Sequence, residues 1–150
     1  MAITTQYKNL ATGEEIEFNK VNQGTDLMVV HKIEIDSKLK NDMELSIEAP
    51  VPAGFELENP RLSSGRKLVS KLKRLKPSFE EYRDDRYLAA WSLSSGYRSS
   101  GIKDNVFYVA YVMRAVTPGS YLVPAIYIED MYQPIYRANT AESHVIVIAK

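Results

Sequence analysis

The stretch NVFYVAYVMRAV, residues 105–116, decides the fold class of this 150-residue chain. It is built almost entirely of β-branched, aromatic and other apolar residues, and the first two kinds are enriched in strands. Because the apolar character continues through successive positions, we expect a strand that is buried on both faces, as in the middle of a sheet. The segment TPGS, residues 117–120, then predicts a turn, since proline presets φ and glycine can adopt a positive φ.

A second strong strand pattern precedes it at LMVVHKIEI, residues 27–35. Alternate positions share one face of a strand, and the opposite face here becomes polar towards its end. Leu27, Val29, His31, Ile33 and Ile35 form the apolar face. Further strands are expected at residues 43–52, 86–93, 121–128 with an interruption at Pro124, and 143–149, and residues 4–18 are expected to form a hairpin that turns at 11–14.

Seven or more strands with short turns predict an all-β fold, an antiparallel β-sandwich. A chain of this length can bury roughly 70% of its unfolded surface, so residues 1–150 are expected to form a single domain. In PAGFELENPRL, residues 52–62, we expect Pro52 and Gly54 to turn the chain so that Phe55 and Leu57 re-enter the core. This segment is interpreted as a corner that joins two sheets.

The segment between residues 63 and 86 breaks the strand pattern. Apolar residues with helical spacing predict one short helix near 67–76. Residues 64–78 are locally basic, which fits either a binding patch or the solvated face of a surface insertion, and the second interpretation is favoured.

Bulk composition excludes several functional classes. The formal net charge is zero, which argues against a nucleic-acid binder or an anionic-membrane binder. The chain has no cysteine, so it can hold neither a disulfide nor a thiolate metal site. No run of about 18 apolar residues is present, and we expect no membrane insertion. The start, MAITTQYKN, lacks the pattern of a signal peptide. The chain is expected to be a fragment of a longer exported protein.

No catalytic, metal or cofactor site is expected. His31 and His144 are the only histidines, and neither has Asp, Glu or Cys at ligand spacing. In YRDDR, residues 82–86, Asp84 and Asp85 would point to opposite faces of an extended strand, beside two arginines that can neutralise them. We interpret this as a structural ion-pair cluster. Since the known nucleophile and nucleotide motifs are also absent, the chain is predicted not to be an enzyme.

One segment has an unusual composition, IYIEDMYQPIYR, residues 126–137. It follows a turn-rich region and is expected to be a loop at a sandwich edge, yet it holds three tyrosines and a methionine. Loop side chains usually face water and are small and polar. Met131 and Tyr132 therefore either pack on the edge of their own sandwich or contact another molecule or domain.

Four segments in this order resemble one family: PAGFELENPRL, EYRDDRYLAA, RAVTPGSYLVPA and EDMYQPIYRANT. They look like the C-terminal macroglobulin-like domain of bacterial alpha-2-macroglobulins, the counterpart of the receptor-binding domain of vertebrate relatives. TGEEIEFNKVNQGTDLMVVHKIEI, residues 12–35, resembles the opening of that domain. The resemblance covers nearly the whole chain and implies a macroglobulin- or immunoglobulin-like sandwich from a much larger multidomain protein.

The resemblance also implies a function. Alpha-2-macroglobulins are protease inhibitors: a protease cleaves a bait region, the molecule rearranges, and a thioester in a separate domain reacts with the protease. The chain without cysteine cannot carry that thioester. Its implied role is to pack on the thioester domain of the same parent chain and shield the bond from water. The parent is expected in the periplasm, as a cell-envelope lipoprotein or a secreted protein, with proteases as its targets.

Met131 and Tyr132 match the position of the shielding loop in that family. Tyr offers a broad apolar face with few rotatable bonds, and Met adapts to an irregular partner surface. The expected supporting residues are Tyr127, Glu129, Asp130, Pro134 and Tyr136. The alternative function is a stand-alone β-sandwich module that binds a ligand or protein through some of its ten tyrosines.

Overall fold

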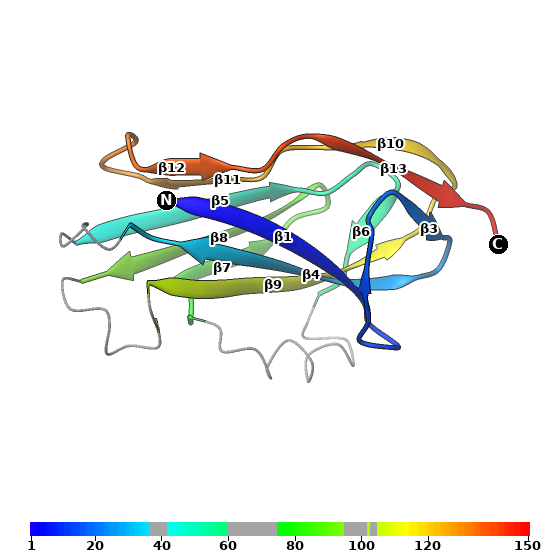
Figure 1. The fold of residues 1–150 in the computed structure, drawn as a ribbon, viewed down its shortest axis with the longest axis horizontal. Coiled ribbons are helices and arrows are strands. Elements are labelled where there is room, and N and C mark those ends of the chain that lie inside the picture. Colours follow the sequence, from blue (N-terminus) through cyan, green and yellow to red (C-terminus); the bar gives the residue numbers. More distant parts are fainter. Residues whose placement is uncertain (37–41, 60–74, 95–101, 103–104) are drawn as a thin grey trace.

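The computed structural model describes residues 1–36, 42–59, 75–94, 102 and 105–150. In these ranges the chain forms strands in three sheets and no helix, which confirms the all-β prediction (Figure 1). The helix predicted near 67–76 lies outside the described residues except for Leu75 and Lys76, which are not helical. Accordingly, no helix in the described part could cross a membrane.

The first sheet has the strand order β2-β1-β4-β9-β6 and is antiparallel throughout. Its long central pair, β4 and β9, comes from the two stretches with the strongest strand patterns, and runs from Asp26 opposite Arg114 to Glu34 opposite Val106. The predicted turn at 11–14 joins β1 to β2. In strand order, the bounds are β2 (Glu15–Ile16), β1 (Ala2–Asn9), β4 (Asp26–Glu34), β9 (Val106–Ala115) and β6 (Phe55–Leu57).

The second sheet has the order β12-β11-β5-β8-β7 and is also antiparallel. It lies behind the first sheet in the view of Figure 1. Ring contacts join the two sheets: Trp91 meets Phe107 edge to face at 5.3 Å between centroids, and Tyr87 stacks on Tyr111 at 4.8 Å. The bounds are β12 (Arg137–Asn139), β11 (Tyr127–Asp130), β5 (Met43–Pro50), β8 (Arg86–Leu93) and β7 (Phe79–Tyr82).

A small third sheet, of order β10-β13-β3, lies at the opposite end of the molecule from the β11–β12 turn (Figure 1). Its strands are β10 (Gly119–Val123), β13 (Ser143–Ile148) and β3 (Lys20–Asn22). Pro124 follows β10, so the chain leaves this sheet and enters the second sheet as β11. The β13–β3 pair is parallel and is the one exception to antiparallel pairing among the described strand pairs. The reason is that β3 is paired by the distant last strand instead of by a hairpin neighbour.

The core fills the space between the sheets. The predicted inner face of β4 and its continuation is buried at every position, with Leu27, His31 and Ile33 at 0% exposure. The prediction that β9 is buried on both faces is also confirmed. Its inner face joins the main core, and its outer face contributes Ala110 and Val112 to a second buried cluster with residues of β4.

The predicted corner at residues 52–54 joins β5 of the second sheet to β6 of the first, as expected. The N–H of Phe55 donates to the carbonyl of Pro52 at 2.9 Å, and Phe55 is buried in the core. Gly54 is required here because the ring of Tyr121 lies over it. A Cβ at position 54 would come within 2.2 Å of Cε2 of Tyr121.

Candidate functional site

The β11–β12 hairpin contains the segment expected to be a loop. The structure corrects this prediction: Tyr127–Asp130 forms β11 and Arg137 begins β12, so the connection is only residues 131–136. The strand forms because Ile128 and Asp130 face inward while Tyr127 and Glu129 face outward. β11 pairs on one side with β12 and on the other with β5.

Three large apolar side chains project from this connection, and we call Met131, Tyr132 and Ile135 the apolar tip. Their exposed fractions are 47%, 80% and 82%. Tyr132 therefore does not pack on the edge of its own sandwich, and Met131 does so only in part. Single exposed apolar residues are common, but three within five positions mark a candidate contact surface.

Hydrogen bonds fix the backbone of the apolar tip. Oδ1 of Asp130 accepts the N–H of Tyr132 at 3.0 Å and that of Gln133 at 3.2 Å. The N–H of Met131 donates to the carbonyl of Glu44 on β5 at 2.8 Å. The N–H of Tyr136 donates to the carbonyl of Gln133 at 2.9 Å, which closes a turn with Pro134 in its second position. The exposed side chains thus project from a backbone that hydrogen bonds hold in place.

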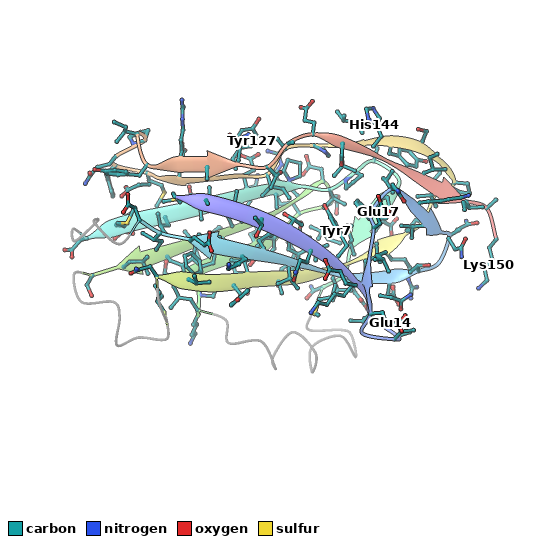
Figure 2. The ribbon with its side chains drawn as sticks, in the orientation of Figure 1. Tyr7, Glu14, Glu17, Tyr127, His144 and Lys150 are labelled. Carbon is teal, nitrogen blue, oxygen red and sulfur yellow. The ribbon has the colours of Figure 1, made fainter. Side chains whose placement is uncertain are left out.

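The residues expected to support the tip lie in different environments. Asp130 is buried and contacts the tip backbone, and Tyr136 is half-buried against the core. Pro134 is exposed within the turn. Tyr127 and Glu129 lie exposed on β11 and outside the turn, and Figure 2 shows the position of Tyr127. The structure therefore brings Asp130, Pro134 and Tyr136 to the tip and leaves the other two on the strand.

Ile135 was missed in the sequence analysis. A signal for it exists, because Gln133-Pro134 favours a turn and the position after the proline usually holds a small polar residue. The turn does not require a β-branched apolar residue at that position. Its 82% exposure makes it the most exposed of the large apolar side chains described.

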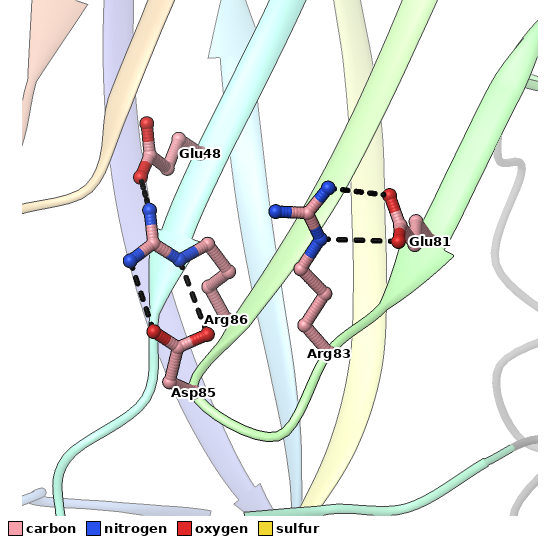
Figure 3. A network of polar contacts seen from close by, with 5 residues as sticks. All are labelled: Glu48, Glu81, Arg83, Asp85 and Arg86. Carbon is pink, nitrogen blue, oxygen red and sulfur yellow. Dashed lines mark hydrogen bonds and ion pairs between the residues drawn. The ribbon is translucent and has the colours of Figure 1, made fainter.

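The YRDDR segment forms ion pairs, as predicted, but its conformation differs (Figure 3). It is not extended: the N–H of Arg83 donates to the carbonyl of Arg86 at 2.9 Å, so Asp84 and Asp85 lie in the turn between β7 and β8. Arg86 pairs with Asp85 and with Glu48 of β5. Its guanidinium lowers the pKa of the Asp85 carboxyl. Arg83 pairs with Glu81 instead of an aspartate.

His31 is fully buried and sits in a hydrogen-bonded row inside the first sheet. Nδ1 lies 2.9 Å from Oγ1 of Thr5, and Nε2 lies 3.2 Å from the hydroxyl of Tyr111. Burial lowers the pKa of His31 to about 3 and raises the pKa of Tyr7 to about 12. Among the described residues no group of three potential metal ligands occurs. The contacts of His31 are those of a neutral core histidine.

The lowered pKa of His31 predicts a pH-dependent stability. Between about pH 6.5 and 3 the unfolded chain binds a proton that the folded chain does not, so the free energy of unfolding falls as the pH falls. From pH 7.5 to 5 we expect this group to remove about 2 kcal/mol. Denaturant titrations at both pH values measure it. In His31→Gln the loss of stability between the two pH values should be much smaller. His144 is exposed, so His144→Gln should lose as much stability as the unaltered chain. An unchanged loss in His31→Gln would contradict the prediction.

Comparison with known proteins gives consistent matches. The family model described as "Bacterial Alpha-2-macroglobulin MG10 domain" matches residues 1–134. The chain is 35% identical over 129 residues to the alpha-2-macroglobulin of Xylella fastidiosa strain Temecula1, covering 79% of this chain and 7% of that protein. It is 32% identical over 109 residues to the alpha-2-macroglobulin of Escherichia coli K12, covering 65% of this chain and 6% of that protein.

Solved structures match over nearly the whole chain. Salmonella alpha-2-macroglobulin reacted with methylamine has a TM-score of 0.76 at 26% identity, covering 97% of this chain and 9% of that one. The native conformation of E. coli alpha-2-macroglobulin has a TM-score of 0.76 at 26% identity, covering 98% and 9%. The chain thus spans less than a tenth of the length of each of these proteins.

Proposed function

This chain belongs to the family of bacterial alpha-2-macroglobulin MG10 domains, and we propose that its apolar tip packs on the thioester domain of the same parent protein and shields the thioester in the resting state. The observation that carries the proposal is the exposure of three large apolar side chains on a turn whose backbone is held by hydrogen bonds. Such a surface is suited to covering another apolar surface.

The chemistry of the tip suits this role. A thioester hydrolyses in water, so its cover must exclude water. Tyr132 supplies a broad ring with only two side-chain torsions, which costs little entropy to immobilise. Met131 is flexible and polarizable and can fill gaps on an irregular surface. Ile135 extends the apolar area beyond the pair expected from the sequence. The shared turn lets all three contact one partner.

The remaining functions of the parent would lie in other domains. We propose that residues 1–150 form one non-catalytic domain of a large multidomain protease inhibitor. The thioester would lie elsewhere, since this chain has no cysteine. The whole parent would act on proteases in the periplasm, as a cell-envelope lipoprotein or a secreted protein. The matches to full-length proteins of which this chain covers under a tenth support this assignment.

The proposal is tested by the rate of spontaneous thioester loss in the full-length parent. Met131→Ser and Ile135→Ser each remove apolar contact area. Ile135 is 82% exposed, so covering it fully contributes about 1.5–3 kcal/mol to docking, whereas Met131 is 47% exposed and contributes about half as much. Hydrolysis proceeds from the undocked state, so the rate should rise about tenfold or more in Ile135→Ser and about fourfold or more in Met131→Ser. The rate is followed by titrating the thiol that hydrolysis releases.

Leu122→Ser is the matched control. Leu122 on β10 is 46% exposed, close to the 47% of Met131, but it lies in the third sheet, far from the tip. It should leave the rate unchanged. Equal rates for all three variants and the unaltered parent would contradict shielding by the tip and would favour a module that binds a separate ligand or protein.

A further inference from the structure

Asp130 occupies an unusual place for a carboxylate. It is the last residue of β11, faces inward in the strand alternation, and is only 1% exposed. Its register partner on β5 is Leu45, which is completely buried. An apolar residue would be expected at such a position, because burying a charge without full compensation is costly. The identity of residue 130 therefore calls for a reason other than core packing.

The two oxygens of Asp130 have different environments. Oδ1 accepts the N–H groups of Tyr132 and Gln133, the first residues after the strand. Bonds from a backbone N–H to an ionised carboxylate are stronger than those between neutral groups. Oδ2 is buried and finds no hydrogen-bond partner among the described residues. An unpaired buried oxygen lowers stability, so this carboxylate is not the choice that stability alone would favour.

Asp130 also binds the connection between β11 and β12 through its backbone. Its own N–H donates to the carbonyl of Tyr136 at 2.9 Å, which closes the base of the turn. With the Met131 N–H bound to Glu44, every backbone N–H from residue 130 to 133 has a defined acceptor. Removing the carboxylate would release two of these four, and those two belong to Tyr132 and the residue after it. The carboxylate thus acts on the segment that presents Tyr132.

We propose that Asp130 is a positioning residue for the shielding contact: its carboxylate fixes the backbone that presents Tyr132 to the thioester domain. This inference rests on the proposed function. Asp130 does not touch the thioester itself. It restricts the tip to fewer conformations before docking, so the tip loses less conformational entropy when it docks. Such preorganisation strengthens a contact without adding area to it.

The test compares Asp130→Ala with Asp130→Asn in the full-length parent. Alanine removes the acceptor, and the rate constant of methylamine inactivation should rise about tenfold, as expected for the loss of about 1.4 kcal/mol in docking. Asparagine retains one side-chain oxygen for the same two N–H groups and should stay within about threefold of the unaltered parent. Thermal unfolding of both variants verifies that the β-sandwich remains folded.

A double-mutant cycle with Tyr132→Ala separates positioning from a general loss of structure. If Asp130 acts through the tip, adding Asp130→Ala to Tyr132→Ala should raise the rate by much less than tenfold, because the group being positioned is already gone. A second readout is hydrogen exchange in the protease-cleaved parent, where the amides of residues 132 and 133 should exchange about tenfold faster in Asp130→Ala.

The outcomes are distinguishable. If Tyr132→Ala speeds inactivation but Asp130→Ala does not, the positioning role is wrong while the proposed function stands. Fully multiplicative effects in the cycle, or unchanged exchange at residues 132 and 133, would also overturn the positioning role. If neither variant changes the inactivation rate, the proposed function itself fails and the role of Asp130 in shielding fails with it.

Discussion

Replacing Tyr132 with alanine in the full-length parent is expected to raise the rate constant of methylamine inactivation by about thirtyfold. Tyr132 is 80% exposed in this chain, so nearly its whole ring is available to a partner. Aromatic anchors at the centre of an interface typically contribute at least about 2 kcal/mol when truncated, which corresponds to this factor in the population of the undocked state. The measurement is thioester loss against time at several methylamine concentrations.

Two matched variants show whether the faster inactivation depends on an aromatic ring at position 132. Tyr127→Ala removes a tyrosine that is 54% exposed on the same hairpin but outside the turn, and it should leave the rate unchanged. Tyr132→Phe keeps the ring and removes only the hydroxyl, so it should stay close to the unaltered parent. A rate for Tyr132→Ala equal to that for Tyr127→Ala would contradict the assignment.

Replacing Trp91 with alanine should produce the largest loss of stability, about 3–5 kcal/mol in the free energy of unfolding. Trp91 is 2% exposed and packs edge to face on Phe107 across the two main sheets. Its Nε1–H also donates to the carbonyl of Leu75 at 3.1 Å. The substitution would therefore leave a cavity between the sheets and an unpaired buried carbonyl. Equilibrium unfolding in urea measures the change.

Trp91→Phe is the conservative partner of this variant. It retains an aromatic ring against Phe107 but loses the hydrogen bond to Leu75, so we expect a smaller loss of about 1–3 kcal/mol. If Trp91→Ala cost less than about 1 kcal/mol, the contact between the sheets would not be the main source of stability in this region.

The strands could be predicted from the sequence because each carries its own signal. β4 and β9 are long and rich in β-branched and aromatic residues, and β8 was predicted with the bounds that the structure shows. The corner at Gly54 could be predicted for the same reason, since turn residues stand between two apolar runs. The parallel pairing of β13 with β3 could not be predicted, because pairing between distant short strands depends on the closure of the whole sandwich.

Only part of the candidate site could be predicted from the sequence. Met131 and Tyr132 stand out by composition, and the family resemblance supplied their proposed role. The inward position of Asp130 was hidden because a carboxylate in a strand pattern suggests a solvent-facing site or a loop, and only its two backbone contacts explain its burial. Ile135 was overlooked because an apolar residue near a strand suggests a core position, whereas its turn leaves it exposed.

The central claim is that the tip is covered in the native parent, and the oxidation of Met131 tests it most directly. Met131 is 47% exposed in this chain, whereas Met28, Met43 and Met113 are buried and Met1 is half-buried. Mild peroxide should therefore convert Met131 to its sulfoxide first wherever the tip is free. In the native parent we expect sulfoxide formation at Met131 to be at least about tenfold slower than in the protease-cleaved parent, in which we propose that the tip is uncovered. Equal oxidation rates in the two states would contradict the account.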